Sequence, residues 1–224
     1  MGEGMKITFT GVDRRTTKSE IEGLLADERV EIGVLYSAHP EGRNRYMEED
    51  EILRALEWCA GRAALHICGS LPRTRLLIGD IDGMVLLVRR IQVNGAILPD
   101  QVNEICRMYP IQQIITQHTD LNTRLLDVPA DNHAVLVDGS GGRGMTPVQW
   151  VRPITGMSVG FAGGLGPANI VDAIKSIREV ARDPFWIDME GKIRDDGDWF
   201  NVWRCHDVLR SLSVGGAGLL PMSL

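Results

Sequence analysis

The chain has 224 residues, an apolar fraction of 44% and a net charge of −6 at pH 7, which suits one soluble α/β domain with a large core. No apolar run approaches the roughly 20 residues that a membrane helix requires, and residues 1–5 lack the basic and apolar regions of a secretory signal, so we predict a cytoplasmic protein that does not bind membranes. Lys and Arg are scattered rather than gathered into a stripe, which argues against nucleic-acid binding but leaves room for a small anionic ligand.

Short apolar, β-branched runs recur along the chain, and each is bounded by Gly, Pro, Asp or Ser. Runs of about four to eight such residues are typical of strands that are buried on both faces of a parallel sheet. In chain order, the predicted strands are residues 5–10, 30–36, 64–68, 89–93, 113–117, 133–138, 157–162 and 185–189.

Stretches with a helical period fill most of the gaps between these strands. Thr17-Lys18-Ser19-Glu20 has the pattern of a capping box and predicts the start of the first helix. The connection at residues 119–128, after the fifth strand, carries only a weak helix signal. The other predicted helices are residues 49–60, 99–109, 167–181 and 199–212.

Eight strands with mostly helical connections predict an α/β fold of the (β/α)8 TIM barrel type. We expect a single barrel domain over residues 1–213, followed by a Gly-rich tail at residues 214–224. A doubly wound open sheet, built from the same alternation of strands and helices, is the alternative architecture.

Three of the predicted strands end in acidic residues or glycines. The sixth ends at Asp138 and is followed by a Gly-rich loop; the seventh runs into Gly163 and Gly164; the eighth contains Asp188 and closes on Gly191. Asp138 alone is explained equally well as a cap for the following turn. Because the functional residues of such barrels lie at the carboxyl ends of the strands, and phosphate often binds after the seventh and eighth, we predict that a small phosphorylated, sugar-like ligand binds there.

Several segments resemble motifs of one enzyme family, in the order that the family has them. Residues 91–95 (I-Q-V-N-G) are similar to Q-L-H-G, and residues 136–138 with 141–144 resemble L-L-D…G-G-T-G. Residues 162–169 (A-G-G-L-G-P-A-N) match A-G-G-L-x-P-x-N closely, and residues 187–191 match V-D-V-S-S-G in part. This pattern resembles the phosphoribosylanthranilate isomerase family of tryptophan biosynthesis, within the ribulose-phosphate-binding barrels.

The resemblance implies an Amadori rearrangement, in which an aminoaldose becomes an aminoketose, with Asp138 as the general acid. It implies that Arg45 binds the carboxylate of the substrate, although on residue type alone a solvated loop charge is as good an explanation. It requires neither a cofactor nor a metal, and the oligomeric state stays open. Contacts to the rest of the substrate are expected from Asn94 and Asp188, and backbone donors for the phosphate from Gly142, Gly163, Gly164 and Gly191.

The general base of the family is missing from this chain. The family has a Cys in K-I-C-G at the end of the first strand, where Lys6-Ile7-Thr8 has Thr8, and a hydroxyl is a far poorer base than a thiolate. His66 and Cys68 share one face of the third strand, so Cys68 is a tentative replacement. A buried structural Cys beside a satisfied His explains the same residues, and His118 on the fifth strand is a further candidate.

The four cysteines form no C-x-x-C pair, and the His and Asp residues lack the spacing of metal ligands, so we predict neither disulfides nor a metal site. Three functional hypotheses remain. We favour an isomerase of the phosphoribosylanthranilate type. A lyase or epimerase of the same superfamily would keep the phosphate site and change the reaction, and a barrel without activity would bind a phosphorylated ligand or a protein partner.

Overall fold

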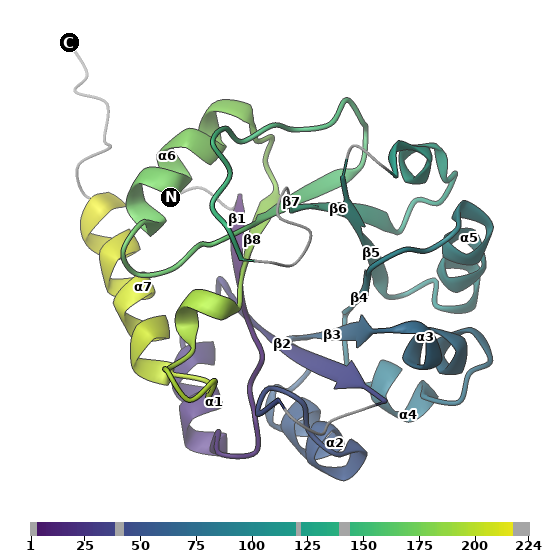
Figure 1. Cartoon of the computed structure of the whole chain (residues 1–224), viewed down its shortest axis with the longest axis horizontal. Helices are drawn as coiled ribbons and strands as arrows, with labels where there is room; N and C mark the ends of the chain where they lie inside the picture. Colours follow the sequence, from purple (N-terminus) through teal and green to yellow (C-terminus); the bar gives the residue numbers. More distant parts are fainter. Residues whose placement is uncertain (1–3, 39–42, 120–121, 139–143, 217–224) are drawn as a thin grey trace.

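In the computed structural model, which describes residues 4–38, 43–119, 122–138 and 144–216, eight parallel strands close into a barrel (Figure 1). Strand β1 pairs with both β2 and β8, so the barrel prediction is confirmed and the open-sheet alternative is wrong. Each predicted strand is present to within one residue at either end. The strands are β1 Met5–Thr10, β2 Val30–Ser37, β3 Ala63–Cys68, β4 Arg90–Asn94, β5 Gln113–His118, β6 His133–Asp138, β7 Ser158–Ala162 and β8 Phe185–Met189.

Helices surround the ring of strands (Figure 1). The predicted capping box is present, since the Glu20 N–H donates to Thr17 Oγ1 at 3.3 Å and the Thr17 N–H donates to Glu20 Oε2 at 2.8 Å. Within the described residues no helix is long and apolar enough to cross a membrane. The helices are α1 Lys18–Leu25, α2 Glu49–Trp58, α3 Ser70–Leu77, α4 Asp82–Val85, α5 Pro99–Met108, α6 Ile170–Val180 and α7 Val202–Gly216, with 3-10 turns η1 Thr123–Asp127 and η2 Gly191–Ile193.

Three connections differ from the prediction. Helices α3 and α4 were not predicted, because α3 buries only Pro72 and Leu76 and α4 is a single turn, so neither has an apolar stripe. In the weakly signalled segment after β5, the described residues 122–128 form the turn η1 and no α-helix. The last helix, α7, continues to Gly216, beyond the predicted end at residue 212.

The interior of the barrel has an apolar half and a polar half. Alternate residues of a strand point to opposite faces, so Ile7 and Phe9 of β1 pack outward against the helices while Thr8 and Thr10 point inward. On the side of β5 to β8, a separate apolar cluster fills the interior. On the side of β1 to β4 the interior is polar. The apolar cluster comprises Ile115, Ala134, Leu136, Ala162 and Trp186, and the buried polar residues include Thr8, Thr10, Glu31, His66 and Gln92.

Two glycines let large or polar side chains enter the interior. A Cβ at Gly160 of β7 would lie 2.0 Å from the indole of Trp186, and a Cβ at Gly33 of β2 would lie 2.1 Å from Thr10 Oγ1. The Trp186 ring fills the apolar half of the barrel interior, and the guanidinium of Arg90 lies 4.1 Å from the centroid of this ring. The floor of the barrel is therefore packed, and the cavity described below lies toward the carboxyl ends of the strands.

Candidate active site

A cavity of about 690 Å³ opens at the carboxyl ends of the strands. The structure brings most of the predicted site residues together around it, although they come from loops and strands that are far apart in the chain. Thr8 and Gly163 are not among the lining residues, and Gly142 lies outside the described residues. The predicted residues that line the cavity are Arg45, Cys68, Asn94, Asp138, Gly164, Asp188 and Gly191.

One end of the cavity is formed by the turn between β7 and α6 together with the turn after β8. Gly163 and Gly164 have φ angles of +126° and +59°, and a Cβ at Gly164 would lie 2.6 Å from the backbone N of Thr146, so glycine is required there. The Asn169 side chain holds the turn, since its Nδ2 donates to the Gly164 carbonyl at 3.0 Å. Lys192, which the motifs did not indicate, adds a cation beside Gly191 at this end.

Asp138 lies next to this glycine turn. It ends β6, is 5% exposed, and pairs in register with Ala162 of β7, the residue that precedes Gly163. A Cβ at Gly163 would lie 3.6 Å from Asp138 Oδ1. The carboxyl group therefore faces the cavity beside the backbone that is expected to hold the phosphate.

Asp188 of β8 is the second carboxylate that faces the cavity. Thr10 Oγ1 donates to its Oδ1 at 2.7 Å, and His66 Nε2 lies 3.9 Å from its Oδ2. Burial is the largest cause that raises the pKa of Asp188, and the charges of Glu31 and Asp138 act in the same direction, while the hydrogen bond from Thr10 and the charge of Arg90 lower it. The net pKa is about 7. Asp188 thus changes its charge near neutral pH.

Cys68 and His66, the two predicted replacement residues, are not bonded to each other. They are linked through the side chains of Asn94 and Gln92. Asn94 Nδ2 donates to Cys68 Sγ at 3.4 Å, and Gln92 Nε2 donates to Asn94 Oδ1 at 3.0 Å and to His66 Nδ1 at 3.2 Å. Burial raises the pKa of Cys68 to about 12 and lowers the pKa of His66 to about 4. At neutral pH the pair is therefore a thiol and a neutral imidazole.

Thr8, the residue at the position of the family base, lies below the cavity. Its Oγ1 donates to Glu31 Oε2 at 3.1 Å, and the same carboxylate oxygen pairs with Arg90 Nη1 at 2.8 Å. His118 ends β5 and is not among the residues that line the cavity. The polar residues of β3 and β4 that line the cavity are His66, Cys68, Gln92 and Asn94.

Arg45 is held by two carboxylates. Its guanidinium pairs with Glu190 and with Asp198, and its Nε donates to Asp198 Oδ2 at 3.2 Å. Asp198 also accepts from Arg194 Nε at 3.0 Å. A carboxylate of a ligand would compete with these partners for the guanidinium of Arg45.

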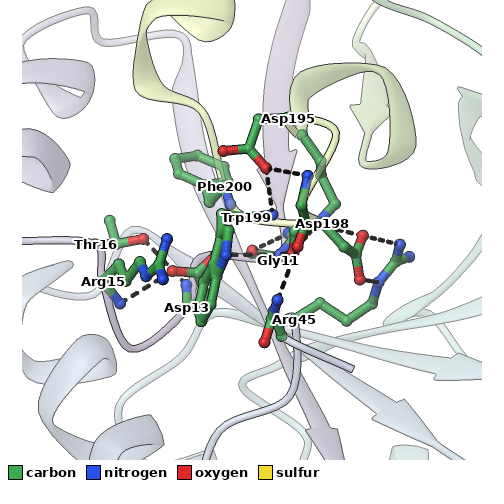
Figure 2. A network of polar contacts seen from close by, with 12 residues as sticks. Gly11, Asp13, Arg15, Thr16, Arg45, Asp195, Asp198, Trp199 and Phe200 are labelled. Carbon is green, nitrogen blue, oxygen red and sulfur yellow. Dashed lines mark hydrogen bonds and ion pairs between the residues drawn. The ribbon is translucent and has the colours of Figure 1, made fainter. Parts of the chain in front are cut away.

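This ion pair belongs to a network that joins the loop after β1 to the segment after β8 (Figure 2). Arg194 is 2% exposed, and its Nη2 pairs with Asp13, whose side chain is fully buried, at 3.1 Å. The guanidinium of Arg15 lies 3.5 Å from the centroid of a Trp199 ring. The network fixes the β8 side of the cavity mouth, where Glu190 lies.

Other charged residues at the mouth are Arg43 and Arg73, which line the cavity without a carboxylate within ion-pair distance in the described part of the chain. The same part of the chain contains no group of three His, Cys, Asp or Glu side chains arranged to hold a metal ion. The positive charges of Arg43 and Arg73 favour an anion at the mouth.

Comparisons with known proteins agree with this arrangement. No protein-family model matches the sequence. Over 117 residues, 48% of this chain and 53% of the relative, the sequence is 31% identical to N-(5′-phosphoribosyl)anthranilate isomerase from Methanothrix thermoacetophila. The sequence resembles phosphoribosylanthranilate isomerases. The match spans about half the length of that relative.

The fold resembles the same enzymes along nearly its whole length. The crystal structure of phosphoribosylanthranilate isomerase from Thermus thermophilus superposes with a TM-score of 0.68 and 17% identity, covering 94% of this chain and 99% of that one. A phosphoribosylanthranilate isomerase in complex with reduced 1-(o-carboxyphenylamino)-1-deoxyribulose 5-phosphate superposes with a TM-score of 0.62 and 12% identity, at coverages of 94% and 99%. The structural likeness shows the TIM-barrel fold, and the sequence match confirms the resemblance to the family.

Proposed function

We propose that the chain is an intramolecular aldose–ketose isomerase that carries out the Amadori rearrangement of phosphoribosylanthranilate, as in tryptophan biosynthesis. The observation that carries the proposal is the position of Asp138, which faces a cavity of about 690 Å³ beside the glycine turn of residues 163 and 164. The 31% identity to the isomerase from Methanothrix thermoacetophila supports it. The ligand of the isomerase complex, a reduced deoxyribulose 5-phosphate derivative, supports a small phosphorylated ligand.

The proposed roles of the residues are as follows. Asp138 donates a proton to the ring oxygen of the sugar, so that the bond between C1 and this oxygen breaks and a C1=N double bond forms. Backbone N–H groups at Gly164 and Gly191 and the cation of Lys192 line the cavity and bind the phosphate. Gly163, in the same turn, and Gly142, which lies outside the described residues, are the other expected donors. Asn94 and Asp188 contact the sugar.

Loss of phosphoribosylanthranilate fluorescence on addition of purified protein tests the proposal. Turnover by the wild-type protein, together with its loss in Asp138→Asn, is the expected result. Asp207→Asn on the exposed face of α7 is the matched control, because it removes a carboxylate that does not line the cavity, and we expect it to keep activity. Absence of turnover over a wide range of enzyme concentrations would refute the activity.

A second candidate substrate follows from the partners of Arg45. Since Glu190 and Asp198 already neutralise this guanidinium, a phosphorylated aminosugar without an anthranilate carboxylate fits the site with less rearrangement. Comparison of phosphoribosylanthranilate with the corresponding phosphoribosylaniline separates the two. Equal kcat/KM for both would favour the second candidate, and a preference for the anthranilate compound would favour the first.

The remaining alternatives are a lyase or epimerase that uses the same phosphate site, and a barrel without activity. Binding of the reduced deoxyribulose 5-phosphate derivative in a saturable manner, without turnover of either aminosugar, would favour these alternatives over the isomerase.

A further inference from the structure

The rearrangement requires a base at C2 of the sugar, and the three residues considered first are poorly suited. Thr8 donates to Glu31 and does not line the cavity. Cys68 lines the cavity, but burial raises the pKa of its thiol to about 12, so the thiolate is scarce. His66 Nδ1 accepts from Gln92, so that nitrogen cannot take up a proton from a ligand.

Asp188 is the remaining buried acid–base group that faces the cavity in the described residues. The strand register places it beside the proposed acid, since Asp138 of β6 pairs with Ala162 of β7 and Ala162 pairs with Asp188 of β8. Two strand spacings separate the two Asp backbones by about 10 Å. Because the side chain of Ala162 is small, it leaves space for a sugar ring between the carboxyl groups of Asp138 and Asp188.

The two oxygens of the Asp188 carboxylate have different surroundings. Thr10 donates to Oδ1 at 2.7 Å and fixes the orientation of the group. Within the described part of the chain, Oδ2 has no hydrogen-bond donor in range, since its nearest polar neighbour, His66 Nε2, lies 3.9 Å away. Oδ2 is thus the oxygen that can accept a proton.

His66 Nε2 is itself a buried atom without a hydrogen-bond partner among the described residues. Because Gln92 donates to Nδ1, the neutral ring carries its proton on Nε2, and this proton is a buried donor that lacks an acceptor. Such a group is costly to leave unpaired, and a ligand oxygen would satisfy it. A hydroxyl and a hydrogen on the same carbon would meet His66 Nε2 and Asp188 Oδ2 respectively, since these two atoms are 3.9 Å apart.

We propose that Asp188 is the general base of the rearrangement, with His66 binding the 2-hydroxyl of the substrate and Thr10 positioning the carboxylate. This inference rests on the proposed isomerase function. After Asp138 has protonated the ring oxygen, Asp188 removes the proton from C2. The electrons of the C2–H bond form the C1=C2 double bond, and those of the C1=N bond return to the nitrogen.

The second half of the reaction restores both carboxyl groups. Asp188, now protonated, donates its proton to C1, while the 2-hydroxyl loses its proton to the Asp138 carboxylate and becomes the C2 carbonyl. Each Asp gains and loses one proton in the cycle, so the overall change is an isomerisation without a co-reactant.

The electrostatic surroundings of Asp188 agree with this role. Burial raises its pKa to about 7, where a carboxylate is a much stronger base than usual and is still ionised in part. The groups that face it come from five strands: Thr10 on β1, Glu31 on β2, His66 on β3, Arg90 on β4 and Asp138 on β6.

The experiment compares wild type, Asp188→Asn, Asp188→Glu and the matched control Asp207→Asn in the fluorescence assay and in binding of the reduced deoxyribulose 5-phosphate derivative. We expect Asp188→Asn to lower kcat by about 10²- to 10⁴-fold and to change the Kd of the derivative by less than about threefold. Asp188→Glu should recover part of the activity, and Asp207→Asn should match wild type. Unchanged kcat in Asp188→Asn, with wild type active, would overturn the assignment and leave the proposed function intact, whereas an inactive wild type would overturn both.

Thr10→Val provides a second measurement that does not depend on the folding of the Asp188 variants. Its hydroxyl lowers the pKa of Asp188, so its removal should move the rising limb of kcat against pH to higher pH, whereas a merely structural loss would lower kcat at every pH alike. A limb that stays in place would contradict the assignment.

Discussion

Asp188→Asn should stabilise the protein in a pH-dependent way. In the folded chain burial raises the pKa of Asp188 from 3.8 to about 7. Between these two values the unfolded state has lost the proton and the folded state has kept it, so ionisation favours unfolding and the wild type loses stability as the pH rises. Asparagine has no proton to lose, and the variant therefore escapes this loss.

The size of the effect follows from the same two pKa values. A shift of about three units corresponds to a total of about 4 kcal/mol once the pH exceeds the folded pKa, and to about 2.5 kcal/mol between pH 5 and pH 8. The free energy of unfolding, measured by urea denaturation of wild type and variant at intervals of one pH unit, gives this difference directly. The constant cost of replacing an oxygen by an amide cancels in the comparison across pH.

The result that would refute the reasoning is a difference in unfolding free energy that does not change with pH. It would mean that Asp188 titrates alike in the folded and unfolded chains, and that the buried carboxylate is solvated or compensated by neighbours. Asp207→Asn, on the exposed face of α7, controls for the loss of one carboxylate from the surface.

Three further substitutions test other parts of the site. Asp13→Ala removes the fully buried one of the two carboxylates that pair with Arg194, together with the acceptor of the Phe200 N–H, and should lower the free energy of unfolding by about 3 kcal/mol. Urea denaturation measures this, and a loss below about 1 kcal/mol would contradict it. Gly164→Ala places a methyl group against the loop backbone at a positive φ. It should weaken binding of the reduced deoxyribulose 5-phosphate derivative by more than about tenfold, since about 1.4 kcal/mol of strain suffices for that factor. Unchanged affinity in a calorimetric titration would argue against a phosphate contact at this turn. Glu190→Gln frees Arg45 from one of its two carboxylates and should lower KM for phosphoribosylanthranilate without lowering KM for phosphoribosylaniline; an equal change for both would show that Arg45 does not contact the anthranilate carboxylate.

The strands of the barrel could be predicted because each one is buried on both faces and is therefore a continuous apolar run. The same reasoning missed α3, because a helix that buries only Pro72 and Leu76 has no stripe to detect. It also could not distinguish a closed barrel from an open sheet. Closure depends on the pairing of β1 with β8, which brings Met5 beside Phe185, and no local pattern encodes a contact over such a separation.

The site could be predicted in part for the same reason. Asp138, Gly164 and Gly191 each lie at a strand end or in a turn whose local sequence marks it, and the structure brings them to one cavity. The partners of Arg45 and Asp188 could not be predicted, since Asp198 is 153 residues from Arg45 and Thr10 is 178 residues from Asp188.

The proposed pair of carboxylates also explains how a base can be replaced without a new kind of side chain. Both carboxyl groups face one cavity, and the charge of Asp138 adds to the burial that raises the pKa of Asp188. The first step requires two groups in different roles, because one must donate a proton to the ring oxygen while the other accepts the proton from C2. In this proposal, the buried carboxylate of Asp188 on β8 replaces the reactive group that the adjacent strand β1 lacks. The hydrogen bond from Thr10 holds this carboxylate in place, and the missing Cβ at Gly33 leaves room for the Thr10 side chain.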